Sequence, residues 1–166
     1  MKTVYYSRHA KSSWEYLNLK DIHRPLNKRG KQDAPLMAKQ LNLLLKGQKI
    51  DAILSSTSQR TRETLIPFAE TFGISADQVL FDPSLYLADA DYLIEALFQL
   101  SDEIDLVLLF AHNPGITDLA SRVSSFPIEN VPTCGLFQVE FNTNSWTEVQ
   151  VPKSKMGFFT FPKMYK

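Results

Sequence analysis

The sequence predicts a mostly parallel, doubly wound α/β sheet with an antiparallel edge. Along most of the chain, short apolar runs typical of strands alternate with segments whose apolar residues follow helical spacing. This alternation is typical of a parallel sheet covered by helices on both faces. The C-terminal part differs, because residues 135–141 and 146–151 alternate in polarity around a turn at 142–145, which predicts a hairpin. Residues 158–161 either add a last strand or cover the core.

The expected parallel strands are short and apolar. They are residues 3–7, 50–55, 79–81 and 104–111. The run 104–111 is so continuously apolar that we expect a central strand with both faces covered.

Helix start and stop signals separate these strands. Asn27 is an N-cap for a helix over 28–46 that Gly47 ends, and Pro35 predicts an irregular first turn or two. Either of residues 57 and 58 caps a helix that runs to residue 72, is kinked at Pro67 and ends at Gly73.

Two further helices follow. Asp89 or Asp91 starts one that ends near residue 100, and the turn 113–115 leads into another with Ile116, Leu119, Ala120 and Val123 on one face. Residues 11–24 lack clear periodicity and are expected to form a loop over the site.

Length and charge limit the classes of protein that fit. A chain of 166 residues suits a single domain spanning 1–166. Eighteen basic and eighteen acidic side chains give zero formal net charge, which argues against broad capture of nucleic acid. There is no membrane-length apolar run and no apolar leader, so we expect a cytoplasmic protein without a membrane partner. Cys134, the only cysteine, is expected to be a small buried apolar residue.

Four residues follow three separate apolar strands and could meet at one place. Arg8 and His9 follow the first strand, Arg60 comes just after the second, and His112 follows the run 104–111. Ligands of open α/β sheets bind beyond the carboxyl ends of the strands. Alone, His112 could be an ordinary strand-end histidine and Arg60 a solvated helix residue. Together, the four residues favour phosphoryl transfer through a histidine.

Four motifs in order resemble the histidine phosphatase superfamily, which has the phosphoglycerate mutase-like fold, a three-layer α/β/α sandwich. Residues 8–14 (RHAKSSW) are similar to its Arg-His-Gly signature, and residues 21–30 (DIHRPLNKRG) resemble the Arg-Pro-Leu stretch of its short SixA-like phosphohistidine phosphatase branch. Residues 55–64 match the strand-end Ser and helix-borne Arg, and residues 111–114 (AHNP) match the second-histidine motif.

The resemblance implies a role for each matching residue. His9 would be the nucleophile that becomes phosphorylated, and Arg8, Arg60 and His112 would complete the phosphate pocket, with Asn113 beside them as a further binding residue. We expect His9 to attack as the free base and His112 to donate to phosphate in its protonated form. No metal or other cofactor is required, and a His-based metal site is the weaker alternative.

The chain departs from the family pattern in ways that bear on substrate. Ala10 replaces the usual Gly, and Glu15 stands where mutases carry Asn, so we expect its carboxylate to point away. We find no match to the family's general-acid glutamate. Asp89 and Asp91 are possible acids, although both also fit helix N-caps.

The leading hypothesis is therefore a phosphohistidine phosphatase that acts on a phosphorylated protein. The alternative is a phosphatase for small phosphorylated molecules, with Asp89 or Asp91 as acid. A third hypothesis is a phospho-ligand binding module without turnover, which would not need a nucleophile.

Overall fold

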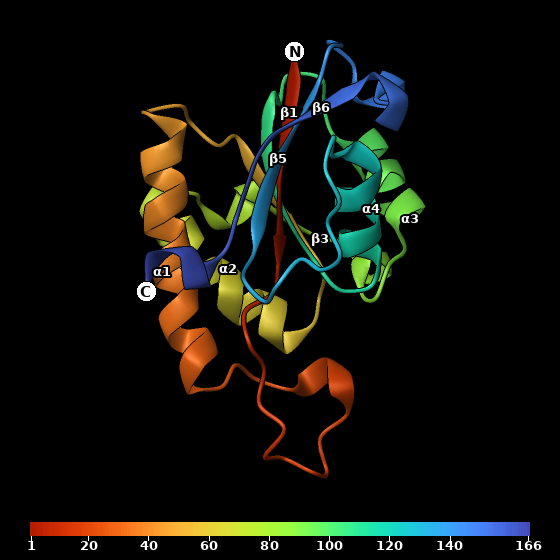
Figure 1. Cartoon of the computed structure of the whole chain (residues 1–166). Coiled ribbons are helices and arrows are strands. Elements are labelled where there is room, and N and C mark those ends of the chain that lie inside the picture. Colours follow the sequence, from red (N-terminus) through yellow and green to blue (C-terminus); the bar gives the residue numbers. More distant parts are fainter.

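The computed structural model describes residues 1–166, and its centre is one six-stranded sheet (Figure 1). The strands are β1 (Lys2–Arg8), β2 (Ala52–Ser55), β3 (Val79–Phe81), β4 (Leu106–Ala111), β5 (Leu136–Phe141) and β6 (Ser154–Thr160). Their order across the sheet is β3-β2-β4-β1-β5-β6. The first four are mutually parallel, whereas β5 runs antiparallel to both β1 and β6. The sheet is thus mostly parallel with an antiparallel edge, as the sequence predicts.

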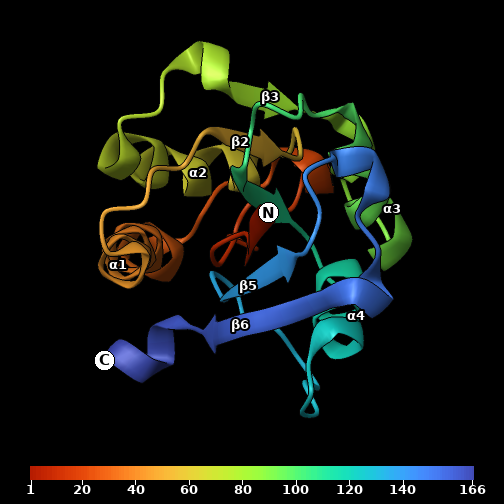
Figure 2. The same cartoon turned by 90° about the horizontal axis from the view of Figure 1, so that it is seen from above.

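Helices cover both faces of this sheet and make three layers. Viewed from above, α1 (Lys28–Leu45) and α2 (Gln59–Phe72) lie on one face, and α3 (Ala90–Glu95) and α4 (Gly115–Val123) lie on the other (Figure 2). Short 3₁₀ helices occupy several connections: Asp21–His23, Ala76–Gln78, Pro83–Leu85, Ala96–Gln99, Trp146–Glu148, Val151–Lys153 and Pro162–Tyr165. No helix has both the length and the apolar composition that a membrane span requires.

The core divides into two clusters because successive strand residues point to opposite faces. Val4 and Tyr6 of β1 pack in the cluster under α3 and α4, whereas Tyr5 packs in the cluster under α1 and α2. Residues 107–111 of β4 are fully buried, as expected for a strand with both faces covered.

Most helix boundaries follow the capping signals. Asn27 accepts a hydrogen bond from the Gly30 N–H, and Ser58 caps α2 in the same way. Gly73 ends α2 with a left-handed φ of 63°.

In α1, by contrast, Lys46 rather than Gly47 is the C-cap residue, with φ of 49°. The expected disruption at Pro35 is also wrong, because α1 continues through it: Pro35 is exposed, so the carbonyl that loses its intrahelical donor can reach water.

Two expectations about strands and helices were wrong in extent. Residues 146–151 are not the hairpin partner of β5, since β6 takes that place. The indole of Trp146 is fully buried and donates to the Ile104 carbonyl, which binds this segment to the core, and Pro152 lacks the N–H that a strand ladder needs. In the other region, regular helix ends at Glu95, and residues 96–99 continue as a 3₁₀ helix.

Candidate active site

The two histidines lie side by side because β1 and β4 are neighbouring parallel strands. Arg8 is paired in register with Ala111, so the residues that follow them, His9 and His112, leave the sheet at the same level. Their ring centroids are 5.1 Å apart. Strand β2, on the other side of β4, delivers Arg60 at the start of α2. The structure therefore brings together all four residues that the sequence indicated.

The His9 imidazole has a fixed tautomer. Its Nδ1 lies 2.7 Å from the Ala10 carbonyl oxygen, which can only accept, so Nδ1 carries the proton and Nε2 keeps its lone pair. The side chain is 7% exposed. Burial is the main cause that lowers the pKa of His9 well below its ordinary value, and the charges of Arg60 and Arg8 act in the same direction. His9 is therefore a free base with Nε2 unprotonated.

The residue after His9 is held by α2. The Ala10 N–H donates to Thr64 Oγ1 over 2.9 Å, and Ala10 is not among the residues with positive φ. This backbone needs no glycine, which explains why alanine is tolerated here.

Arg60 is buried and held by Asp21 and His112. It is 3% exposed, and its guanidinium donates to the backbone oxygen of Asp21 over 2.7 Å and to its Oδ2 over 2.9 Å. One of its terminal nitrogens also lies 3.4 Å from Nδ1 of His112. The N-cap at Ser58 starts α2 just before Arg60, so the helix sets the direction of this side chain.

His112 is neutral in the free protein, whereas the expectation that it donates in its protonated form concerns the state with phosphate bound. Its Nε2 lies 2.8 Å from Ser56 Oγ, and its Nδ1 faces a nitrogen of Arg60 that can only donate. Burial and the charge of Arg60 lower the pKa of His112 to about 3. At 1% exposure the ring has little water to stabilise a charge.

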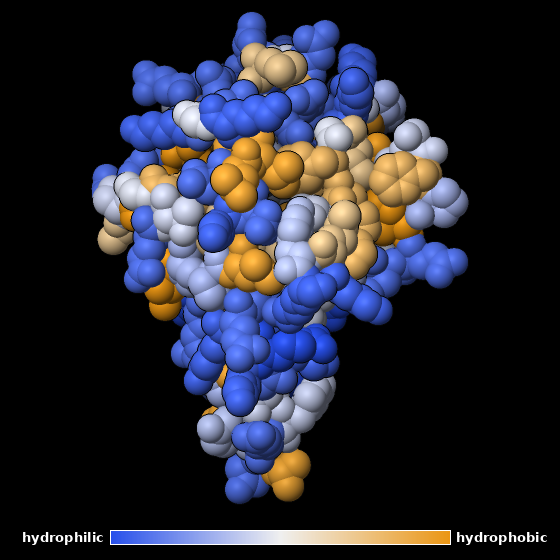
Figure 3. Space-filling model, turned by 60° about the vertical axis from the view of Figure 1, so that its left-hand side comes forward, coloured by the Kyte–Doolittle hydropathy of each residue, from blue (hydrophilic) through white to orange (hydrophobic).

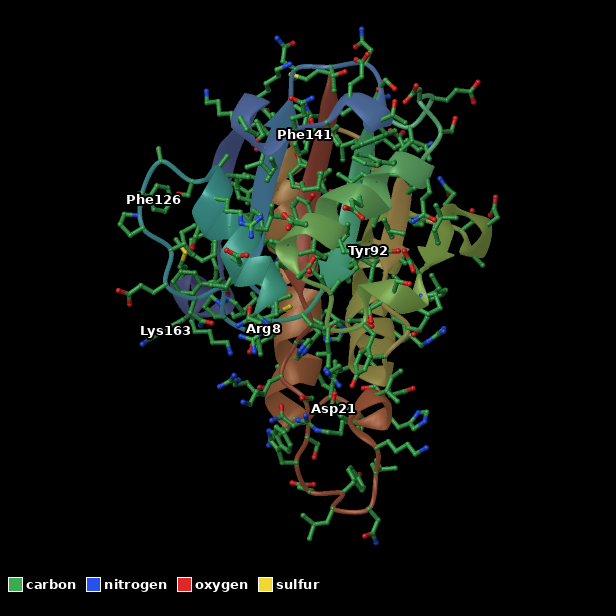
Figure 4. All side chains as sticks on the ribbon, turned by 90° about the vertical axis from the view of Figure 1, so that its right-hand side faces the viewer. Arg8, Asp21, Tyr92, Phe126, Phe141 and Lys163 are labelled. Carbon is green, nitrogen blue, oxygen red and sulfur yellow. The ribbon has the colours of Figure 1, made fainter.

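Arg8 has hydrogen-bonding capacity to spare. One terminal nitrogen donates to the Val131 carbonyl over 2.9 Å, while its buried Nε has no hydrogen-bond partner within the protein. Burial and the nearby Arg60 lower the pKa of Arg8. The side chain lies at the lower end of the protein body, next to the projecting loop that carries Asp21 (Figure 4).

Asp21 belongs to the site although the sequence did not single it out. Its carboxylate accepts hydrogen bonds from Arg60, from Arg24 over 2.9 Å and from the Tyr86 hydroxyl. These three donors hold the pKa of Asp21 far below its usual range, in spite of the opposing effect of burial. Arg24 is itself fixed by the Ser13 carbonyl and by the ring of Trp14, which it covers at 3.3 Å. The spacing of Asp21 and Arg24, three residues apart in the resembling stretch, was the available signal.

The remaining candidates are committed to other contacts. Asp89 caps α3 by accepting from the Tyr92 N–H over 2.9 Å, and Asp91 forms an ion pair of 2.6 Å with Arg122. Asn113 accepts from Thr117 Oγ1 over 2.6 Å and donates to Asn130 over 3.0 Å. Cys134 is buried, which raises the pKa of its thiol.

Two other observations concern the surroundings. Glu15 is exposed to solvent. His, Cys, Asp and Glu side chains form no group of three or more that could hold a metal ion.

Comparison with known proteins identifies the family. The model of the histidine phosphatase superfamily (branch 1) matches residues 4–85, which contain Arg8, His9 and Arg60. The chain belongs to the histidine phosphatase superfamily. It is therefore a phosphatase of the metal-independent kind, and the family resemblance in the sequence is confirmed.

A relative and two solved structures illustrate the similarity. An uncharacterized chloroplastic protein of Arabidopsis thaliana is 36% identical over 149 residues, which cover 85% of this chain and 67% of that protein. The protein histidine phosphatase SixA, solved with tungstate, has a TM-score of 0.80 at 20% identity, covering 99% of both chains. A phosphoglycerate mutase from Plasmodium falciparum has a TM-score of 0.58 at 19% identity, covering 83% of this chain and 81% of its own. The fold is thus phosphoglycerate mutase-like.

Proposed function

We propose that this phosphatase hydrolyses phosphohistidine on a protein and that His9 carries the phosphoryl group during turnover. The observation that carries the proposal is the combination of a free-base nucleophile, a convergent set of cations and carboxyl groups that are all committed elsewhere. Such a site is well equipped for phosphoryl transfer and poorly equipped to protonate a basic leaving group.

The first step uses the lone pair on His9 Nε2. This nitrogen attacks phosphorus and the bond to the leaving nitrogen breaks, so the phosphoryl group moves to His9 and the electron pair goes to the leaving imidazole. Water then attacks phosphorus and releases inorganic phosphate and free His9. The hydrogen bond from Nδ1 to the Ala10 carbonyl fixes the ring throughout and stabilises the positive charge that develops on it.

The arginines stabilise the phosphoryl group in transit. Negative charge spreads over its equatorial oxygens, and preorganised cations aimed at them supply most of the catalysis. Nε of Arg8 is free to donate, and Arg60, which has a terminal nitrogen 3.4 Å from His112 Nδ1, adds a fixed positive charge beside the histidines. A bound phosphoryl group also adds negative charge beside His112, which raises its pKa and favours the protonated, donating form.

The carboxyl groups near the site favour a nitrogen leaving group. An alkoxide needs a proton as it departs, which is the work of a general acid. Asp89 caps a helix, Asp91 is paired with Arg122, and Asp21 is ionised by its three donors. Imidazole departs as a neutral ring and needs no such acid.

The surroundings of the site suit a macromolecular substrate. The loop between β1 and α1 projects from the body as its narrow lower end (Figure 3). It carries exposed apolar side chains, of which Trp14 is 70% and Leu17 is 93% exposed. The fold also agrees more closely with SixA than with the mutase, with TM-scores of 0.80 and 0.58.

A comparison of substrates tests the proposal. The enzyme should hydrolyse a phosphohistidine peptide with a kcat/KM at least 100-fold above that for alkyl phosphates such as sugar phosphates. The reverse preference would contradict the proposal and favour a phosphatase for small phosphorylated molecules. Absence of turnover on every phosphorylated compound would leave only ligand binding.

A further inference from the structure

A carboxylate beside a phosphate site requires an explanation. Asp21 is bound to Arg60, one of the two arginines of the proposed phosphate pocket, so its negative charge lies close to the substrate's phosphoryl group. Like charges repel, and a neutral acceptor would hold Arg60 without that repulsion. The charge on Asp21 therefore suggests a function that needs an anion.

Burial places Asp21 at the mouth of the site rather than at its floor. His9 and His112 are 7% and 1% exposed, whereas the Asp21 side chain is 44% exposed. In an in-line transfer to His9, the leaving group lies on the side of phosphorus opposite to His9 and therefore points toward the mouth. In that orientation, the leaving group and the partly exposed Asp21 carboxylate both lie toward solvent.

The charged and titratable groups that face Asp21 keep it ionised. Arg60 approaches from α2, Arg24 from its own loop and Tyr86 from the segment before α3, while His112 lies behind Arg60. These contacts hold the pKa of Asp21 far below its usual range. The carboxylate is therefore an acceptor at all working pH values, and it has no proton to give.

We propose that Asp21 is a specificity-determining residue that accepts a hydrogen bond from the protonated distal ring nitrogen of a phosphohistidine substrate. The inference rests on the proposed function and adds the group that recognises the leaving imidazole. In phosphohistidine one ring nitrogen bonds to phosphorus, and the other is free to take a proton. A carboxylate at the mouth stabilises the cationic ring that results.

This contact assists bond cleavage without transferring a proton. When the P–N bond breaks, its electron pair goes to the ring nitrogen that held phosphorus. If the distal nitrogen is protonated, the product is neutral imidazole and the proton remains where it was. If it is not protonated, the product is an imidazolate anion, which is a far more basic leaving group. Asp21 therefore favours the only protonation state that leaves easily.

The same charge discriminates between substrate classes. A phosphorylated aryl or alkyl alcohol departs with negative charge on oxygen, and a carboxylate nearby opposes that development. Asp21 thus raises the rate for a cationic leaving group and lowers it for an anionic one. Opposite effects on two substrates that share a phosphoryl group are the signature of this role.

The test is to assay Asp21→Asn on a phosphohistidine peptide and on p-nitrophenyl phosphate. Asparagine keeps an oxygen acceptor for Arg60 and removes the charge, while its amide nitrogen takes the place of the oxygen that accepts from Arg24. We expect kcat/KM to fall by about 10- to 100-fold for the peptide, the worth of one charge-assisted hydrogen bond, and to stay equal or rise for the aryl phosphate. The alkaline limb of the peptide pH profile should shift to lower pH, because the bound ring loses its proton more easily. Asp118→Asn, which removes an exposed carboxylate bound to Arg122 over 2.7 Å on α4, is the matched control and should change neither substrate.

Each other result has a defined meaning. Equal losses on both substrates with an unmoved pH profile would show that Asp21 only positions Arg60, and the inference would be overturned. A wild-type enzyme that hydrolyses aryl phosphate but not the phosphohistidine peptide would overturn the proposed function and the inference with it. A wild-type enzyme that prefers the peptide, with an unchanged ratio in Asp21→Asn, would overturn the inference alone.

Discussion

Replacing Arg60 by alanine should remove most of the activity while leaving the fold in place. One preorganised donor in comparable sites is worth about 100- to 1000-fold in rate, and one terminal nitrogen of Arg60 lies 3.4 Å from His112 Nδ1. Loss of the Arg60 side chain also leaves no unpaired charge buried, because its partner Asp21 is 44% exposed and water can solvate the carboxylate. The unfolding free energy should therefore fall by about 1.5 to 3 kcal/mol, the worth of a hydrogen bond to a charged group. Arg60→Lys should recover little activity, because an ammonium lacks the planar fork.

The assay should combine kinetics with a titration. The steady-state kcat on a phosphohistidine peptide, measured after any initial burst, gives the rate loss. NMR titration of the His112 ring gives its pKa. Because the charge of Arg60 is one cause of the depression to about 3, this pKa should rise in Arg60→Ala, although burial will keep it below the ordinary value. Arg62→Ala is the control: Arg62 is exposed, donates to the Thr57 carbonyl and lies over the Phe81 ring. Equal rate losses at both positions, or an unmoved His112 pKa, would refute the reasoning.

Three further outcomes follow from the same geometry. His9→Ala should abolish turnover with an unchanged circular dichroism spectrum, and rapid quench of the wild type should trap an acid-labile, base-stable label; activity close to wild type would disprove the covalent intermediate. Replacing Asp89 and Asp91 together with Asn should barely change phosphohistidine hydrolysis and spare the α3 cap, whereas a general acid would be worth about 100- to 10,000-fold on alkyl phosphates. Finally, the folded protein holds His112 neutral down to a pKa of about 3, so the unfolded state binds more protons below pH about 6.5. Stability should fall as pH drops through that window, by about 1.4 kcal/mol per unit for this histidine, and His112→Gln should flatten the decline measured by urea unfolding.

The sheet was predictable because its signals are local. Alternating apolar runs and capping residues such as Asn27 and Ser58 act over a few positions, and they determined the parallel part of the fold. The antiparallel edge was harder. Residues 146–151 have strand-like alternation, but the core takes up the Trp146 indole and β6 pairs with β5 instead, which is a tertiary effect that no local pattern contains.

The site was predictable only where residues follow strands. Arg8, His9 and His112 converge because β1 and β4 are neighbouring parallel strands that end at the same level of the sheet. Asp21 lies on a 3₁₀ turn within a long loop, and Tyr86 follows another such turn, so neither has a periodic position from which its direction could be inferred. Their contacts with Arg60 depend on how two separate connections, the one between β1 and α1 and the one between β3 and α3, fold against the start of α2. Only the three-dimensional arrangement shows this.

Under the proposed function, the electrostatics of the site explain how a chain with zero net charge would bind phosphate and keep His9 as a nucleophile. Arg8 and Arg60 supply local positive charge, and the same charges, together with burial, lower the pKa of both histidines. The cations that attract the substrate thus also keep His9 unprotonated before the substrate arrives. Once a phosphoryl group binds, its negative charge offsets theirs, and His112 can accept a proton at the moment when a donor is useful. Binding and chemistry are therefore coupled through one set of charges, with Asp21 at the mouth as the only carboxylate that contacts Arg60.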